Sequence, residues 1–281
     1  MTEMSVSAGQ RWPVGPRSFA TALWRHRQLL WQLTLREMHG RYRGSWLGLA
    51  WSFVTPLLML AIYTFVFAVI FGAKWGSRPA DGTAHFAIFL FVGLIVYTVF
   101  AECVNRAALL VLASPSYVKK VVFPLELLPI PVVGSALFHA AVSVAVLLGA
   151  MVVSGMSVPW TVVLLPLVLL PLLLAVLGLM WLLGSLGVYL RDIGQVVTLL
   201  TTGLLFLAPV FYPVSAVPEP YRPLLELNPL TFVIESARRV AIDGVAPEAT
   251  AWGLQLAIGA LIAWCGYAWF QRTRKGFADV I

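Results

Sequence analysis

WTVVLLPLVLLPLLLAVLGLMWLLGSLG, residues 160–187, carries no charged side chain over 28 consecutive positions. About 20 helical residues cross the roughly 30 Å of hydrocarbon in a bilayer, so this segment is long enough to span a membrane with some tilt. Its two prolines, Pro166 and Pro171, are compatible with a helix there, because neighbouring helices can satisfy the backbone groups that a proline frees. The segment predicts a transmembrane helix.

Five further apolar segments flank it along the chain. The six expected spans cover residues 49–71, 86–105, 130–153, 160–187, 194–212 and 251–270. The chain is 60% hydrophobic and 11% charged, whereas roughly a quarter of the residues in soluble domains are charged. This composition excludes a cytosolic globular enzyme and a disordered chain. The predicted fold class is an all-α polytopic membrane protein with six transmembrane helices.

Basic residues are distributed unequally between the two alternating sets of loops. Fourteen of the 19 Lys and Arg lie in the N-terminus, the second and fourth loops and the C-terminus, and the other three loops hold five. By the positive-inside rule, both termini are expected to be cytoplasmic. The net charge of +7 therefore reports orientation in a membrane rather than binding to nucleic acid.

Ahead of the first span, the sequence predicts a helix on the membrane surface. Residues 1–20 are expected to be flexible, residues 21–45 to form this interfacial helix, and residues 46–281 to form a single transmembrane domain. Apolar side chains recur along the helix at spacings of three and four residues: Trp24, Trp31, Leu35, Met38 and Tyr42. The helix is either an anchor alone or an anchor that also contacts a cytoplasmic partner.

The second loop, residues 106–129, is longer than a plain connection between two spans requires. A short helical piece within it would carry Tyr117, Lys119 and Lys120. This makes the loop a candidate docking element for another protein. The alternative is that the two lysines only set the topology of the chain.

The external region of residues 213–250 is too long for a structureless loop and is expected to contain helices of its own. Asn228 is a good N-cap for one of them, and Glu235 is placed to pair with Arg238 and Arg239 on its charged side. Its other side forms an apolar stripe: Leu230, Val233, Ile234, Ala237 and Val240. We expect short re-entrant or gate helices that lie on, or dip into, the outer leaflet.

Two polar pairs lie in or at the end of expected spans. Glu102 and Arg106 are four residues apart, which favours an ion pair, with a proton relay as the alternative. Ser135 and His139 are also four apart, as an intramembrane serine hydrolase would require. Small polar residues in membrane helices more often mediate packing, so the hydrolase remains a distant alternative.

An aromatic stripe runs along the second expected span and includes Phe89, Tyr97 and Phe100. Aromatic rings can stack on the faces of sugar rings, so the stripe is a candidate path for a glycan, with helix packing as the alternative.

No lysine follows a glycine and precedes Ser or Thr, so there is no P-loop, and no histidine is followed by glutamate as in zinc proteases. We expect neither a catalytic residue nor a metal site.

Several short motifs resemble one family over the range from about residue 25 to the end of the chain. They are RYRGSWLGLAW at 41–51, TPL at 55–57, FPLE at 123–126, YLRD at 189–192, FYP at 211–213, NP at 228–229 and RKGFADVI at 274–281. Together they resemble the membrane subunits of type 2 ABC transporters that export bacterial polysaccharides, particularly the O-antigen exporter branch.

The resemblance implies a bacterial inner-membrane permease that works as a homodimer with two copies of a separate ATPase subunit. ATP and Mg would then bind to the ATPase, and this chain would need no cofactor. The cargo would be a lipid-linked polysaccharide that moves from cytosol to periplasm. The loop around Tyr117, Lys119 and Lys120 would be the coupling helix, and residues 219–243 would form the periplasmic gate helices.

In such an exporter, four arginines near the N-terminus would contact lipid and substrate phosphates: Arg25, Arg36, Arg41 and Arg43. Three alternatives remain within the superfamily: an exporter of capsule, of teichoic acid, or of drugs and small lipids. Outside it, an intramembrane enzyme and a passive channel are the remaining classes. The channel offers no reason for so long a cytoplasmic loop.

Overall fold

The computed structural model describes residues 16–70, 83–115, 117 and 124–280. These residues form helices and no strand, which confirms the all-α class. The α-helices are α1 (Pro16–Arg25), α2 (Arg27–Tyr42), α3 (Trp51–Tyr63), α4 (Thr83–Ala107), α6 (Pro129–Val153), α7 (Leu165–Tyr189), α8 (Ile193–Leu207), α9 (Arg222–Glu226), α10 (Pro229–Arg238), α11 (Ala249–Thr273) and α12 (Phe277–Val280). Two π-helical segments, Thr64–Ile70 and Arg239–Asp243, extend α3 and α10.

Among the described residues, five helical segments are long and apolar enough to cross a membrane. They are Gly48–Val66, Ala84–Ala107, Leu125–Val153, Trp160–Tyr189 and Ala249–Gly276. Each overlaps one of the six spans expected from the sequence. The remaining expected span, residues 194–212, is shorter than predicted.

The helix in that place, α8, has 15 residues and is therefore about 22 Å long, less than the thickness of the hydrocarbon core. It ends because Ala208 is extended, with φ −87° and ψ 150°. Ala208 precedes Pro209, and the ring of a proline disfavours the helical conformation of the residue before it. The prediction that the helix runs through Pro209 was wrong.

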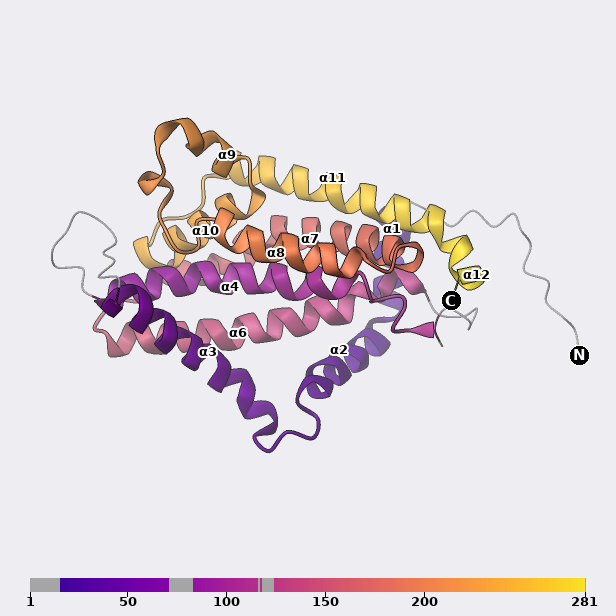
Figure 1. Cartoon of the computed structure of the whole chain (residues 1–281), viewed down its shortest axis with the longest axis horizontal. Coiled ribbons are helices and arrows are strands. Elements are labelled where there is room, and N and C mark those ends of the chain that lie inside the picture. The colour runs from indigo at the N-terminus through magenta and orange to yellow at the C-terminus, as the bar shows by residue number, and fades with distance from the viewer. Residues whose placement is uncertain (1–15, 71–82, 116, 118–123, 281) are drawn as a thin grey trace, which may run out of the picture.

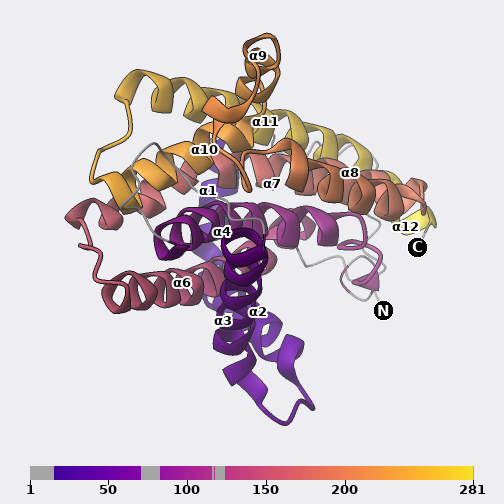
Figure 2. The same cartoon turned by 60° about the vertical axis from the view of Figure 1, so that its left-hand side comes forward.

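The long helices lie side by side, with α4 at the centre (Figures 1 and 2). Helices α6, α7, α8 and α10 all pack against α4, and α11 packs along α7. Most side chains of α4 are consequently buried, whereas α3 contacts few neighbours and exposes most of its apolar surface.

Glycines allow α7 and α11 to approach closely. A Cβ atom at Gly178 would lie 2.7 Å from the amide nitrogen of Ala263, and a Cβ atom at Gly266 would overlap the backbone of Gly178. Small residues at such a crossing let two helix backbones touch, which is how membrane helices gain packing energy without a hydrophobic driving force.

The predicted interfacial helix is interrupted. His26, with φ −102° and ψ 13°, separates α1 from α2. Trp24 and Trp31 are exposed, as an anchor in the membrane surface requires, but α2 also packs against α6, where Thr34 lies directly over Gly134. The predicted interfacial helix therefore packs against α6 and at the same time leaves Trp24 and Trp31 exposed.

Helices α2 and α3 project from the bundle as the two arms of a V (Figure 1). The turn that joins them contains Gly44 at φ 83° and Gly48 at φ 51°, a left-handed conformation that other residues rarely adopt. The turn thereby returns the chain from α2 towards α4 and α6, and leaves space between the two arms.

In the expected gate region, α10 forms as predicted. The Oδ1 atom of Asn228 accepts a hydrogen bond from the backbone N–H of Leu230 at 3.0 Å, and Gly244 ends the π-helical extension with φ 71°. The predicted apolar stripe, Leu230, Val233, Ile234, Ala237 and Val240, is buried. It packs against α4 and α7, so the helix is part of the bundle rather than lying over it.

Candidate functional site

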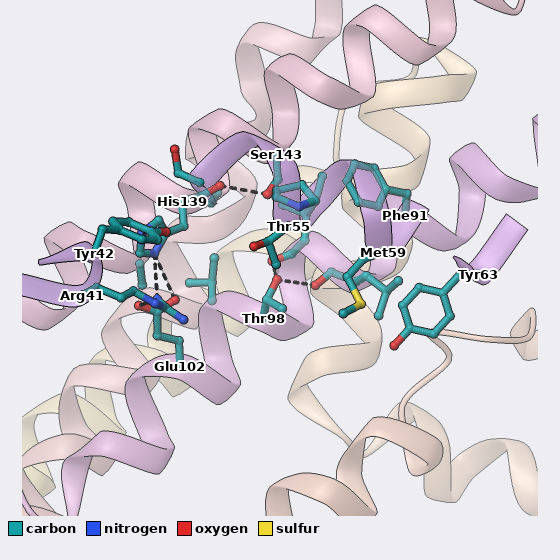
Figure 3. Close-up of a pocket in the computed structure, with 17 residues that line it drawn as sticks. Arg41, Tyr42, Thr55, Met59, Tyr63, Phe91, Thr98, Glu102, His139 and Ser143 are labelled. Atoms are coloured by element: carbon teal, nitrogen blue, oxygen red, sulfur yellow. Dashed lines mark hydrogen bonds and ion pairs between the residues drawn. The ribbon is translucent and has the colours of Figure 1, made fainter. Parts of the chain in front are cut away.

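A cavity of about 220 Å³ lies between α2, α3, α4 and α6, inside the V (Figure 3). One end is polar and is formed by Arg41, Tyr42, Glu102 and His139. The remaining lining is mainly apolar and includes Pro56, Met59, Phe91, Leu94 and Ile95, with the hydroxyl groups of Thr55, Thr98 and Ser143 among them. An amphiphilic molecule with a charged head and an apolar chain would match this distribution.

The polar end is a hydrogen-bonded network that ties α2 to α4 and α6. Arg41 Nη1 lies 2.6 Å from Glu102 Oε1 and 3.0 Å from His139 Nδ1. The Tyr42 hydroxyl lies 3.1 Å from His139 Nε2, and Glu102 Oε2 lies 3.3 Å from His139 Nδ1. Arg41 can only donate and the carboxylate of Glu102 can only accept, so the tautomer of His139 decides which of these two groups forms the hydrogen bond to Nδ1.

Burial at the end of α2 also affects Tyr42 itself. Loss of solvent raises the pKa of its hydroxyl, the charge of Glu102 raises it further, and the guanidinium of Arg41 opposes both effects. The phenol therefore stays protonated at neutral pH and remains available as a hydrogen-bond partner for His139.

The predicted ion pair between Glu102 and Arg106 does not form. Glu102 pairs with Arg41 and His139, and Arg106 pairs with Glu37. Spacing along α4 suggested the pair, but α2 folds back across α4 and supplies a partner of opposite charge to each residue. The result is two links between helices in place of one link within a helix.

The arginines that were expected to contact phosphate separate into three groups. Arg36 and Arg43 line an open groove of about 640 Å³ beside α2, together with His39. Arg41 is engaged with Glu102, although its side chain remains 48% exposed. Arg25 is exposed at the end of α1 and lines neither the cavity nor this groove.

Of the predicted aromatic path, Tyr97 and Phe100 are buried and Phe89 is half-buried. Tyr97 and Phe100 belong to the hydrophobic core, and the Tyr97 hydroxyl donates to the backbone oxygen of Thr201 on α8 at 2.6 Å. Phe89 lies under the guanidinium of Arg238, with 5.4 Å between the guanidinium carbon and the ring centroid. These contacts agree with the alternative of helix packing, because α4 is the central helix, and the glycan path along these three residues stays a prediction.

Arg238, expected on the polar side of the gate helix, is buried with 1% of its surface exposed. It donates to Phe89 O at 3.2 Å, to Val210 O at 2.9 Å and to Glu235 Oε1 at 2.8 Å. Burial lowers the pKa of Arg238, and the carboxylate of Glu235 opposes this shift. The Glu235–Arg238 pair was therefore predicted correctly, whereas Arg239 is exposed and does not share Glu235.

In the second loop, Tyr117 packs against a cluster of buried side chains at the ends of α7 and α11. Lys119 and Lys120, which were predicted to act with it, lie outside the described residues. Glu126 and Arg274, which form an ion pair, each lie in one of the quoted family motifs, but the sequence did not indicate that the two residues meet.

The serine hydrolase alternative has no geometric support. The Ser135 hydroxyl is buried and makes no hydrogen bond in the described structure, while both ring nitrogens of His139 contact Arg41, Tyr42 and Glu102. A nucleophile needs a base within hydrogen-bond reach. Within the described parts of the chain, no group of three or more His, Cys, Asp or Glu could hold a metal ion.

Comparison with known proteins connects this architecture to a family. The chain is 31% identical over 261 residues to the O-antigen export system permease protein RfbA of Myxococcus xanthus, which covers 92% of this chain and 97% of that relative. It is 25% identical over 255 residues to the RfbA protein of Klebsiella pneumoniae, which covers 90% of this chain and 95% of that relative. The family model of the ABC-2 type transporter matches residues 28–242. The chain belongs to the ABC-2 type transporter membrane family.

Proposed function

We propose that this chain is the transmembrane permease subunit of an ATP-driven exporter that moves a lipid-linked polysaccharide, such as O-antigen, from the cytoplasm to the periplasm. The observation that carries the proposal is the end-to-end similarity to two relatives named O-antigen export permeases. Membership of the ABC-2 family and the apolar helices agree with it, since both describe a membrane subunit.

The working unit is a homodimer in the inner membrane with two copies of an ATPase subunit, which bind ATP and Mg. The exposed apolar faces of α3 and α8 support the proposal that a second copy of the chain or lipid covers them, because exposure of apolar surface to water is unfavourable in free energy. They are formed by Phe53, Leu57, Leu58 and Ile62 on α3, by Phe65 on its π-helical extension, and by Leu199, Leu200, Phe206 and Leu207 on α8. The excess of Lys and Arg on one set of loops supports cytoplasmic termini.

In this mechanism the phosphates of the cargo first meet the cations beside α2. Arg36 and Arg43 in the open groove are the residues for this step, since guanidinium groups bind phosphate in a bidentate manner. Arg41 acts at the mouth of the cavity, where Glu102 and His139 hold its side chain in place. The mainly apolar cavity then suits part of the lipid carrier.

Closure of the ATPase subunits on ATP displaces the second loop, and the loop moves the helices that it connects, α4 and α6. Tyr117 is the described residue that we assign to this coupling, and Lys119 and Lys120 would act with it. Helix α10 and its extension form the gate on the periplasmic side, held closed through Asn228, Glu235 and Arg238, with Arg239 at its exposed edge.

Deletion of the gene tests the function. We expect lipid-linked glycan to accumulate on the inner face of the membrane and surface glycan to disappear, and both effects should be reversed by a plasmid copy. Loss of capsule or teichoic acid in place of O-antigen would identify the cargo as one of those polymers. Unchanged glycan with retention of a drug or small lipid would contradict the proposal.

A further inference from the structure

Residues from two distant motifs of the sequence meet at one end of the bundle. Arg274, which follows α11, donates from Nη1 to Oε2 of Glu126 at 2.6 Å. Glu126 lies in the short 3-10 turn Leu125–Leu127 that ends the second loop. Each of the two side chains is only 10% exposed.

The backbone of the same turn is held by a second helix. Trp181 of α7 donates from its ring nitrogen to the backbone oxygen of Glu126 at 2.9 Å. The side chain of Glu126 is thus bound by Arg274 at the end of α11, and its backbone oxygen is bound by Trp181 of α7. Neither helix is joined to the second loop through the chain, since the loop connects α4 to α6.

Both described ends of the loop rest on one cluster of apolar side chains, here called the C-terminal cluster. Its buried members are Val111, Leu125, Leu128, Trp181, Val188, Tyr267, Phe270 and Phe277. Phe19 of α1 and Tyr117 of the loop pack against it. The described ends of the loop therefore lie on a platform made by α7, α11 and α12.

The end of the chain is fixed to this platform. The Tyr189 hydroxyl donates to the backbone oxygen of Thr273 at 3.1 Å, and the ring of Phe277 lies 5.4 Å from that of Phe270. Phe277 is completely buried. Arg274 lies between these anchors, so its guanidinium has little freedom to follow a displaced carboxylate.

We propose that the Glu126–Arg274 pair is a positioning link that transmits displacement of the second loop to α7 and α11. The proposal rests on the proposed function. Two opposite charges with little access to water separate only at a high cost, so the loop and the end of α11 move as one body while the pair is intact. Without the pair, the hydrogen bond from Trp181 and the C-terminal cluster are the described contacts that still tie the loop to α7 and α11, and part of each ATPase stroke is lost.

The test is the amount of glycan exported per ATP hydrolysed by the complete complex in proteoliposomes. For Arg274→Gln we expect ATP hydrolysis within about twofold of wild type and a ratio of export to hydrolysis that falls about fivefold or more. The matched control is Arg272→Gln, which removes an exposed charge from the last turn of α11 and should keep the wild-type ratio. The exchanged pair, Glu126→Arg with Arg274→Glu, should recover about half of the ratio or more.

Three outcomes would overturn the link. One is an Arg274→Gln complex that exports as much glycan per ATP as wild type. Another is an exchanged pair whose ratio of export to hydrolysis is no higher than that of the single variants. If Arg274→Gln does not assemble, this second outcome is the one that refutes the link. The third is a wild-type complex that exports no glycan, which would refute the proposed function itself and is distinguishable because it appears before any variant is made.

Discussion

At the scale of single residues, the network of Arg41, Tyr42, Glu102 and His139 joins three helices that are distant in the sequence. The Arg41–Glu102 bond is short, but its arginine side chain is 48% exposed while the glutamate is 14% exposed. Solvent screens a half-exposed pair, so the stabilisation lies between the values for surface and buried pairs.

We therefore predict a coupling free energy of about 1 kcal/mol between Arg41 and Glu102 in a double-mutant cycle with alanine. Unfolding in mixed micelles measures it. The control cycle uses Arg222 and Glu219, whose charged atoms are 3.9 Å apart on an exposed surface, and should give a coupling near zero. A coupling near zero for Arg41 and Glu102 as well would show that their ion pair adds nothing to stability.

Arg238 holds α10 to two other parts of the chain through backbone oxygens. Arg238→Met leaves the oxygens of Phe89 and Val210 without this donor and removes the charge facing Glu235. We predict a loss of unfolding free energy on the order of 3 kcal/mol, because buried acceptors lose their partners.

The neighbouring variant Arg239→Met is the control for Arg238→Met. Arg239 is exposed, so its replacement should change the unfolding free energy by less than about 0.5 kcal/mol. Both variants can be compared by thermal unfolding in detergent. If Arg238→Met melted at the same temperature as Arg239→Met, the assignment of Arg238 as an anchor of α10 would be refuted.

At the scale of helices, the contact between α7 and α11 depends on the absence of side chains at the crossing. Gly266→Ala places a methyl group against the backbone of Gly178 and should reduce the unfolding free energy by about 1–3 kcal/mol, as other overpacking substitutions do. Gly253→Ala, on the same helix and facing open space, should not destabilise the protein. The midpoint of thermal unfolding distinguishes them, and a tolerated Gly266→Ala would contradict the close crossing.

Local features of the helices were predictable from the sequence. Asn228 caps α10 and the apolar stripe of that helix is buried, because capping and helical periodicity depend on residues a few positions apart. The length of α8 was not predicted correctly. Prolines are tolerated in many membrane helices, and the sequence does not show that Pro209 follows an extended residue.

Contacts between residues of different helices were not predictable from the sequence in the same way. Spacing placed Glu102 and Arg106 together and placed the aromatic residues of α4 on one face, and both inferences were local. Which elements cover that face is decided by the packing of α8 and α10 against α4, which no spacing reveals. His139 and Glu126 were missed as contact residues for the same reason.

At the scale of the whole molecule, the chain combines apolar helices with a sequence that has no P-loop. Its second loop and its C-terminal segment meet on one platform, and its arginine-lined groove and cavity lie beside α2 and α3. These features fit a subunit that receives motion at one surface and guides an amphiphilic cargo at another.

Reconstitution in liposomes tests this division of labour most directly. The purified chain alone should neither hydrolyse ATP nor move lipid-linked glycan, and addition of its ATPase partner should produce both activities together. ATP hydrolysis or glycan movement by the chain alone, at the rate of the complete complex, would contradict the account.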